Sequence, residues 1–221
     1  MNLSKSLEYF DPINSINASI NVIGVGAMGS RIAELLVRLG IPKIHIWDMD
    51  TVEDKNIANQ AYLHHHIGMK KVDALEELLK DINPQVKVYK HGEYKDQALG
   101  GYIFLCVDSI ELRYKIAKDN EHNTTIKAMF DTRMRLEDAQ SYAADWSDEQ
   151  QKKVFLSSMA FTDAEAAEAT PVSACGTTLS AASTVVSTAA FTVSNFINLI
   201  RKHECKAMIF TDAFNHTITS Y

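Results

Sequence analysis

The chain has 221 residues, of which 46% are hydrophobic and 23% are charged, and this composition is typical of one globular α/β domain. Its 22 basic residues against 28 acidic ones give a net charge of −6, which argues against nucleic acid as a partner. The three cysteines form no C-x-x-C pair, so we expect neither a disulfide framework nor a zinc site. We also expect a cytoplasmic protein without a membrane anchor, because no secretory signal or uninterrupted apolar span stands out.

Short apolar runs and amphipathic segments alternate through the first part of the chain. The apolar runs predict strands at 19–24, 43–47, 86–89, 101–107 and 126–130. The amphipathic segments predict helices at 28–39, 69–82 and 109–118. Strands that alternate with helices pair in parallel through right-handed crossovers, so this part predicts a Rossmann-like, doubly wound α/β sheet.

The pattern changes after residue 131. The remaining sequence predicts an antiparallel strand at 137–146, a helix at 147–159, a long Ser/Thr/Ala-rich helix at 175–202 and one or two closing strands at 207–219. No repeat or linker interrupts the chain, so we expect a single domain over residues 1–221. Its parts would be an N-terminal extension (1–18), a mainly parallel half (19–131) and a half of antiparallel strands with the long helix (132–221).

A glycine-rich turn links the first predicted strand to the first predicted helix. Gly24, Gly26 and Gly29 fit G-x-G-x-x-G, in which the first glycine makes the turn, the second lets phosphate approach the backbone and the third packs helix against strand. Asp48 ends the second strand, where an acidic residue accepts ribose hydroxyl groups. This order favours a nucleotide site over a turn without a ligand, and ATP and NAD fit it equally well.

The residues after the second predicted strand distinguish between ATP and NAD as the ligand. The chain here resembles the ThiF/MoeB-like superfamily of adenylyltransferases, whose consensus reads D-x-D-x-V-x-x-x-N-x-x-R-Q, then G-x-x-K, then D-x-x-x-x-R. The matching segments begin at Asp48, Gly68 and Asp108, each at the boundary of a predicted element. Further on, Asp131-Thr132-Arg133-Met134 is similar to a segment of the compact phage- and plasmid-type members.

The resemblance implies a binding site for ATP and Mg²⁺. By motif, Gly24, Gly26 and Gly29 would line the phosphates and Asp48 the ribose. Asp50 would brace the following loop, and Asn56 would contact phosphate from it.

Three residues would then act in the reaction. Lys71 matches the family lysine that neutralises phosphate charge, and Asp108 matches the aspartate that holds magnesium-bound ATP. Arg133 is a further candidate cation. The transfer needs positive charge where negative charge develops on the phosphates, and Mg²⁺ takes hard oxygen ligands.

In the family the product is an acyl-adenylate on the C-terminal glycine of a small ubiquitin-like or sulfur-carrier protein. The resemblance therefore implies that such a protein, or a peptide C-terminus, is the partner, and that the chain forms a homodimer. The sequence departs from the family consensus at a residue expected to contact the phosphates: the arginine of N-x-x-R-Q is Asn59 here. The cations that could substitute are Arg31, Arg133 and Arg135.

Two other functions stay open from the sequence. The uncharged Asn59 also fits a nucleotide-binding partner protein without catalysis, and the opening of the first helix is similar to that of several NAD-dependent oxidoreductases. Cys175, at the predicted start of the long helix, could form a thioester, although a packing role is favoured. For His64–His66 we favour a solvated loop over a metal site, since three adjacent residues on a loop cannot all face one ion.

Overall fold

The computed structural model describes all residues except 175–178 and, in the short helix at 12–15, the side chains of residues 14 and 15. In the described residues the strands are β1 (Ile20–Ile23), β2 (Lys43–Trp47), β3 (Lys87–His91), β4 (Gly101–Leu105), β5 (Ile126–Met134), β6 (Asp138–Asp145), β7 (Met208–Asp212) and β8 (Thr217–Ser220). The α-helices are α1 (Pro12–Ser15), α2 (Ala27–Arg38), α3 (Lys71–Ile82), α4 (Ile110–Asp119), α5 (Glu149–Ser157), α6 (Asp163–Glu168) and α7 (Ala182–Lys202).

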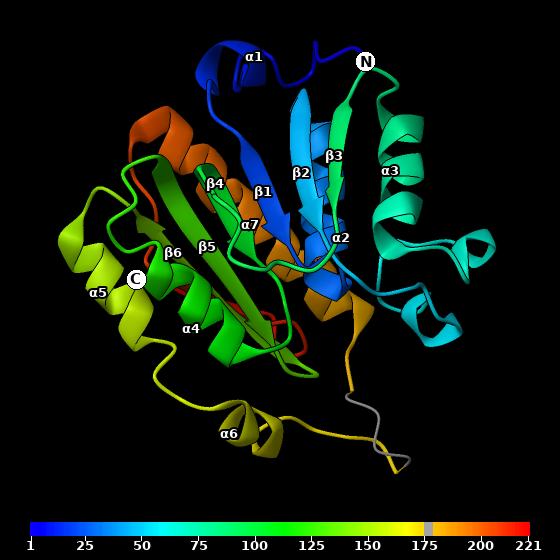
Figure 1. Ribbon diagram of the computed structural model, residues 1–221, viewed down its shortest axis with the longest axis vertical. Coiled ribbons are helices and arrows are strands. Elements are labelled where there is room, and N and C mark those ends of the chain that lie inside the picture. Colours follow the sequence, from blue (N-terminus) through cyan, green and yellow to red (C-terminus); the bar gives the residue numbers. More distant parts are fainter. Residues whose placement is uncertain (175–178) are drawn as a thin grey trace.

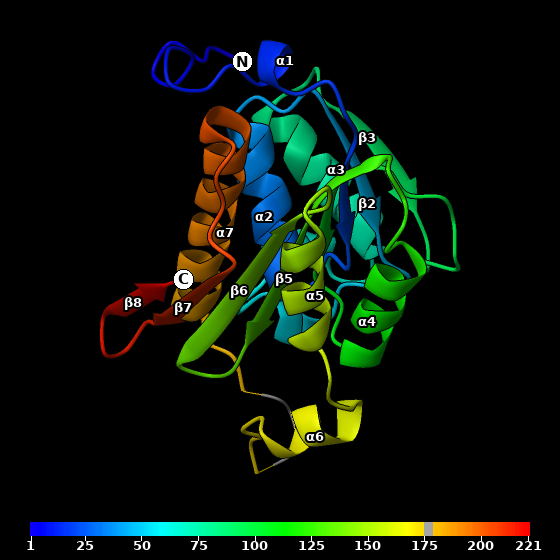
Figure 2. The same ribbon diagram turned by 90° about the vertical axis from the view of Figure 1, so that its left-hand side faces the viewer.

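Among the described residues these eight strands form one sheet in the order β3-β2-β1-β4-β5-β6-β7-β8. The strands from β3 to β5 pair in parallel, and β6, β7 and β8 add to the sheet as antiparallel neighbours. Helices α2, α3 and α7 lie on one side of the sheet, and α4 and α5 lie on the other (Figures 1 and 2). This confirms the predicted doubly wound, mainly parallel α/β fold with antiparallel strands in its C-terminal part.

The buried residues explain why the sheet sits between two helical layers. One apolar cluster joins β1 and β2 to α2, α3 and α7, and a second joins β4 and β5 to α4 and α5. Strand β1 is buried at all four positions, as expected for a central parallel strand covered on both faces. The carboxyl ends of the parallel strands meet at the lower edge in Figure 1, near α6, while α1 lies at the opposite end.

Two element boundaries differ from the sequence-based prediction by more than two residues. The long helix begins at Ala182 rather than at 175, because Ser180 uses its hydroxyl group outside the helix, where it accepts a hydrogen bond from Asn59. The predicted strand at 126–130 continues to Met134, because β5 pairs with the antiparallel strand β6 up to the pair formed by Met134 and Ala139. Cys175 lies outside the described residues, and α7 starts seven residues after it, so the helix-dipole argument for a reactive thiol has no support.

Helix α7 also has the length and apolar composition of a membrane-crossing helix. Of its most apolar 18-residue window, 56% is buried inside the structure, which is typical of a core helix. Threonines on its inner side hydrogen-bond to the sheet: Thr192 Oγ1 donates to Ser141 Oγ at 2.8 Å, and Thr188 Oγ1 lies 3.1 Å from Thr211 Oγ1. The Ser/Thr content of this helix therefore serves packing against β6 and β7.

Aromatic rings stack across β2 and β3 in the order Tyr89, His45, His91 and Trp47. His45 Nδ1 and His91 Nε2 lie 3.1 Å apart within this stack. Burial lowers the pKa of both imidazoles below the ordinary value of 6.5, and the positive charges of His91 and Lys43 lower that of His45 further.

This stack predicts a pH-dependent stability. Because the folded-state pKa values are lowered, the unfolded chain binds more protons below about pH 6.5, and the free energy of unfolding should fall as the pH decreases from 7 towards 5. Urea denaturation at several pH values measures this, and His45→Gln should flatten the dependence. The exposed His122 provides the control, since His122→Gln should retain the wild-type slope. A slope that His45→Gln does not change would contradict this explanation.

Candidate functional site

The glycine turn between β1 and α2 contains glycines of two different kinds. At Gly24 the backbone is left-handed (φ +87°), and a Cβ would lie 2.7 Å from the backbone of Cys106 and Val107. At Gly29 a Cβ would lie 1.9 Å from the carbonyl oxygen of Gly24. A Cβ at Gly26, in contrast, would meet nothing within 4 Å. The fold therefore requires Gly24 and Gly29, whereas Gly26 leaves open space in front of the helix.

That open space lies at the N-terminus of α2. Gly26 is the N-cap residue and has no side chain with which to cap the helix, and the first turn holds no acidic residue. The N–H groups of a first helical turn have no partner inside the helix, and they carry the positive end of the helix dipole. Together with the space above Gly26, they form a cradle that suits a phosphate group.

Asp48, Asp50 and Lys71 connect this turn to α3 by a chain of hydrogen bonds. The Asp48 carboxylate accepts from the backbone N–H of Val25 at Oδ2 and from that of Asp50 at Oδ1, both at 2.9 Å. The Asp50 carboxylate in turn pairs with Lys71 Nζ at 2.8 Å. Lys71 is 8% exposed although it carries a charge. The structure thus brings the predicted ribose, loop and phosphate residues together beside the glycine turn.

The loop after β2 is fastened to α2. Tyr62 Oη donates to the Val25 carbonyl at 2.7 Å, and Ser30 Oγ accepts from the N–H of Ala61 at 3.0 Å. Burial, and then the negative charge of Asp48, raise the pKa of Tyr62, so its hydroxyl stays a donor. Asn56 is buried, and its Oδ1 accepts from Glu53 N at 2.9 Å, which leaves its amide nitrogen as the group that could donate to a phosphate. The predicted irregular stretch contains two short 3₁₀ turns, at 54–56 and 64–66.

Asn59 does not replace the missing arginine by a similar contact. Its Nδ2 donates to Ser180 Oγ at 2.8 Å, so it joins this loop to the segment that precedes α7. Of the three arginines predicted as substitutes, Arg31 contacts this loop: its Nη2 donates to the carbonyl of Gln60, the residue after Asn59, at 2.9 Å. Among the described residues, Arg31 Nε and Gln60 Oε1 are buried and have no hydrogen-bond partner. A buried donor of this kind suits an anion or water.

Asp108 lies three residues after the end of β4. The chain that follows β4 adjoins β1 through the hydrogen bond from Cys106 N to the Ile23 carbonyl at 2.7 Å. The side chain of Asp108 is exposed, and Oδ1 accepts from Ser109 N at 3.0 Å. The preceding carbonyl, of Val107, is held by the buried guanidinium of Arg113. An exposed carboxylate on a fixed backbone is a suitable ligand for Mg²⁺, which takes one or two carboxylates from a protein.

Arg133 takes part in a buried ion cluster on β5. Its guanidinium donates to Asp131 Oδ2 at 2.6 Å and to the carbonyl and hydroxyl oxygens of Ser158, and it lies 4.4 Å from the Tyr142 ring centre. The other Asp131 oxygen accepts from Arg113. All three guanidinium nitrogens of Arg133 are thus engaged, and the geometry assigns it a role in joining β5 to α5. Arg135 pairs with Asp138 at the surface.

This cluster yields a prediction about stability. Asp131 is fully buried, so Asp131→Asn would leave the charges of Arg113 and Arg133 without their carboxylate, and we expect a loss of about 3–5 kcal/mol in the free energy of unfolding. Asp138→Asn, which breaks the exposed pair with Arg135, should cost less than about 1 kcal/mol. Urea denaturation of both variants measures the difference, and equal losses would contradict the assignment.

Asp163 makes hydrogen bonds to the start of α4 that could not be predicted from the sequence. Its Oδ1 accepts from the N–H groups of Ile110 and Glu111, and its Oδ2 accepts from Ser109 Oγ at 2.7 Å. The hydrogen bond from Ser109 is the largest cause of its lowered pKa. Asp163 thus caps α4 from more than fifty residues away and holds α6 beside Asp108. No local pattern in the sequence indicates so distant a cap.

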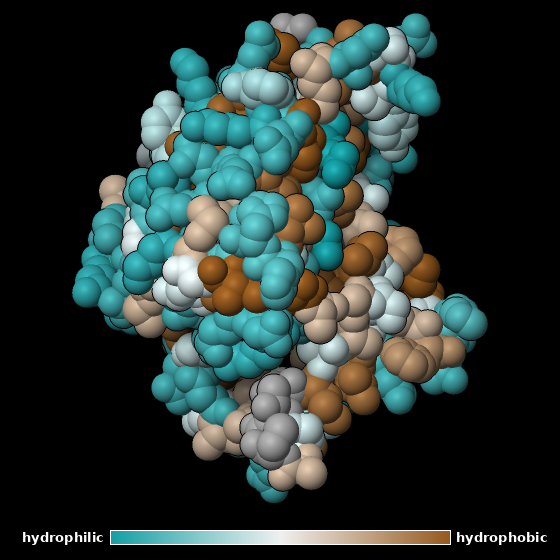
Figure 3. Space-filling view, turned by 90° about the vertical axis from the view of Figure 1, so that its right-hand side faces the viewer, coloured by the Kyte–Doolittle hydropathy of each residue, from teal (hydrophilic) through white to brown (hydrophobic). Residues whose placement is uncertain are grey.

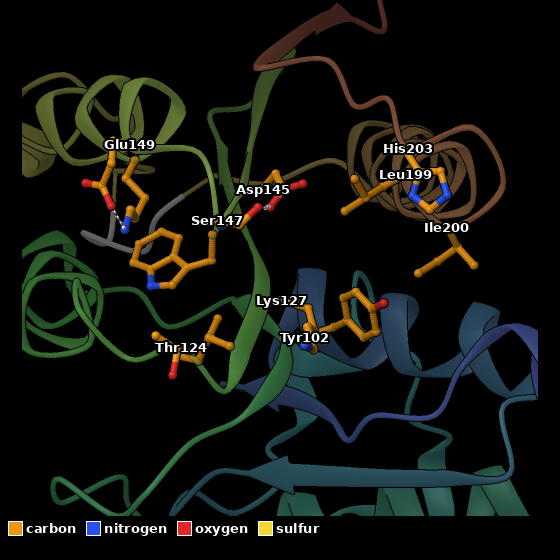
Figure 4. A pocket seen from close by; sticks show the side chains of 12 residues that line it. Tyr102, Thr124, Lys127, Asp145, Ser147, Glu149, Leu199, Ile200 and His203 are labelled. Atoms are coloured by element: carbon orange, nitrogen blue, oxygen red, sulfur yellow. Dashed lines mark hydrogen bonds and ion pairs between the residues drawn. The ribbon is translucent and has the colours of Figure 1, made fainter.

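Two of the hollows in the described surface can be compared with the predicted site residues. One, of about 370 Å³, adjoins the site and is lined by Asp48, Met49, Lys70, Val72, Lys90, His91 and Gly92. A larger one, of about 520 Å³, lies between the beginning of β5, the end of β6 and the end of α7. Figure 4 shows Asp145 and Lys127 on its one side and Leu199, Ile200 and His203 on the other. None of the predicted site residues lines the larger hollow, so the smaller one extends the candidate site.

Two of the three adjacent histidines, His65 and His66, converge on Glu77, and His64 is not part of this group. The nearest Glu77 oxygen lies 3.3 Å from His65 Nε2 and 3.7 Å from His66 Nε2. His66 Nδ1, however, accepts a hydrogen bond from Leu63 N at 3.0 Å, which places the proton of the neutral ring on Nε2. That nitrogen therefore faces Glu77 with its proton rather than with a lone pair, and a metal-ligand role does not suit His66.

Comparison with known proteins identifies the family. The model of the ThiF family matches residues 14–220, nearly the whole chain. The chain belongs to the ThiF family. The ubiquitin-like modifier-activating enzyme 5 of Branchiostoma floridae is 32% identical over 117 residues, which cover 44% of this chain and 29% of that protein. The Arabidopsis thaliana protein of the same name is 40% identical over 68 residues, covering 31% of this chain and 16% of its own. The match to this ThiF-family chain thus spans less than a third of the length of these relatives.

Solved structures share the fold of this ThiF-family protein. Escherichia coli MccB superposes with a TM-score of 0.73 and 15% identity, covering all of this chain and 69% of MccB. PaaA superposes with a TM-score of 0.67 and 17% identity, covering 93% of this chain and 72% of PaaA. At such low identity the likeness establishes the architecture, and the site has to be judged from the residues described above.

Proposed function

We propose that this protein is an ATP- and Mg²⁺-dependent adenylyltransferase that activates a carboxylate. The observation that carries the proposal is the open N-terminus of α2 above Gly26, joined by hydrogen bonds through Asp48 and Asp50 to the buried Lys71. Membership of the ThiF family supports it. So does the hollow beside Asp48, which offers room for the nucleoside next to the phosphate cradle.

In the proposed reaction a carboxylate oxygen attacks the α-phosphorus of ATP. The bond from this phosphorus to the oxygen bridging to the β-phosphate breaks, and pyrophosphate leaves with the bond's electron pair. The α2 N-terminus and Lys71 would hold the phosphates, which accumulate negative charge in the transition state, and Asp48 would accept the ribose hydroxyl groups. Asp108 would hold Mg²⁺, which neutralises phosphate charge when bound.

The carboxylate is proposed to be a protein or peptide C-terminus. Among the relatives, the enzymes from Branchiostoma and Arabidopsis are named for activating a ubiquitin-like modifier, and one MccB structure is described as a complex with ATP. A small ubiquitin-like or sulfur-carrier protein, or a peptide, is therefore the partner class to test first. We also propose a homodimer, following the habit of the family.

The test is isotope exchange between ATP and pyrophosphate in the presence of a panel of ubiquitin-like proteins, sulfur carriers and short peptides. Exchange with a panel member that is lost when its terminal carboxylate is amidated supports adenylation. ATP binding without exchange across the panel contradicts it.

The second candidate function is a nucleotide-binding partner protein without catalysis, which the bond from Asn59 to Ser180 favours. Restoring the family residue separates the two. If the wild-type protein activates a carboxylate, Asn59→Arg should raise the exchange rate further. The reason is that a donor directed at the phosphates contributes about 2.7–4 kcal/mol to transition-state binding. Asn59→Gln, which keeps the neutral amide, is the matched control. Exchange that appears only in Asn59→Arg would instead favour the partner-protein function.

A further inference from the structure

Strand β3 ends the sheet, and its outer side is unpaired in the described part of the chain. Lys87 N donates inward to the Pro42 carbonyl at 3.0 Å, and the His91 carbonyl accepts from Asp48 N at 3.3 Å. Because successive residues of a strand alternate in direction, the N–H and C=O groups of Val88 and Lys90 face away from the sheet. An edge of this kind can accept another extended chain.

The charges beside this edge favour a negatively charged partner. Lys43 and Lys87 lie directly opposite each other on β2 and β3, both exposed, and neither belongs to an ion pair among the described residues. On the other face, Lys90 is neutralised by Asp73 and Glu76 of α3. The edge therefore carries two uncompensated positive charges on a protein whose net charge is −6.

Two like charges opposite each other destabilise a strand pair, and an approaching carboxylate would relieve this. The same lysines disfavour pairing with a second copy, since that would place more lysines side by side. The exposed Tyr89 stacks on His45 at 4.6 Å between ring centres and offers an apolar contact next to the lysines. Figure 3 shows this side of the molecule, where hydrophilic side chains cover most of the upper part.

We propose that β3 is a docking strand for an extended, acidic segment of another protein, which pairs with the outward groups of Val88 and Lys90 and places carboxylates near Lys43 and Lys87. The charge of the edge selects this partner over a second copy. The proposal is independent of adenylation, since docking requires no nucleotide.

The test uses a fluorescein-labelled, capped heptapeptide of alternating valine and glutamate, titrated with the full-length protein at low salt. We expect saturable binding that Val88→Pro weakens about tenfold or more, because proline removes an outward N–H without breaking the ladder to β2. Val88→Thr keeps this N–H and should bind within about twofold of wild type. The double variant Lys43→Gln/Lys87→Gln should bind about fivefold more weakly, and high salt should abolish this difference.

A second probe covers the case in which Val88→Pro fails to fold. The same peptide, methylated on the alternate backbone nitrogens that face β3, should not bind to the wild-type protein. Equal binding of the methylated peptide, or of a peptide with lysine in place of glutamate, would overturn the proposal. So would a complete lack of binding, a dimer that Val88→Pro dissociates, or tighter binding of a single-stranded RNA at the same residues.

Discussion

Replacing Gly26 by alanine should leave the fold intact and weaken ATP binding about 10- to 100-fold. The added Cβ meets no protein atom within 4 Å, so the free energy of unfolding should change by less than about 1 kcal/mol. The methyl group would, however, occupy the space through which a phosphate reaches the N-terminus of α2. Losing one charged hydrogen bond there costs about 1.5–3 kcal/mol, which gives the expected range.

The neighbouring glycines provide the control for this result. Gly24→Ala and Gly29→Ala place a Cβ against backbone atoms, at 2.7 Å and 1.9 Å, and should destabilise the protein by about 3 kcal/mol or more. Calorimetric titration with ATP and Mg²⁺, paired with urea denaturation, separates the two effects. A Gly26→Ala variant that binds ATP as the wild type does would place the phosphates elsewhere.

Lys71→Ala should weaken ATP binding about 10- to 100-fold while the affinity for adenosine stays unchanged. The Lys71 side chain is 10% exposed and its Nζ pairs with Asp50, so its position is fixed before the phosphates arrive. A preorganised cation of this kind interacts strongly with phosphate oxygens, and adenosine has none. The exposed pairing partner Asp50 can be hydrated in the variant, so the fold should persist.

Lys80 is the matched control, since it lies on the same helix as Lys71, is exposed, and pairs with Glu76 at 2.7 Å. Lys80→Ala should change the ATP affinity by less than about threefold. Equal effects of Lys80→Ala and Lys71→Ala would show that general positive charge, and not the position of Lys71, accounts for phosphate binding.

The parallel half of the fold could be predicted because its signals are local. The apolar run at 43–47 is found as β2 with the predicted bounds, and the amphipathic segment before Asn83 is found as α3. Burial of strands on both faces and the spacing of apolar residues along helices are properties of a few neighbouring residues. The glycine turn was recognised for the same reason, and its geometry confirms the turn at Gly24.

The remaining features depend on contacts between distant parts of the chain. Ser180 is drawn out of the predicted helix by Asn59, more than a hundred residues away, and Asp163 caps α4 from α6. Arg133 is a candidate phosphate cation by sequence, but Ser158 at the end of α5 and Tyr142 on β6 contact its guanidinium in the fold. Such pairings arise from the order of strands in the sheet, which the local pattern does not determine.

Calorimetric titration of the wild-type protein with ATP and Mg²⁺, and separately with NAD⁺ and NADH, tests the central claim most directly. A triphosphate that lies on the N-terminus of α2 beside Lys71 should give a saturable isotherm, which Gly26→Ala and Lys71→Ala weaken. The nicotinamide dinucleotides should give none. A clean isotherm with NADH and no heat with ATP would contradict the account.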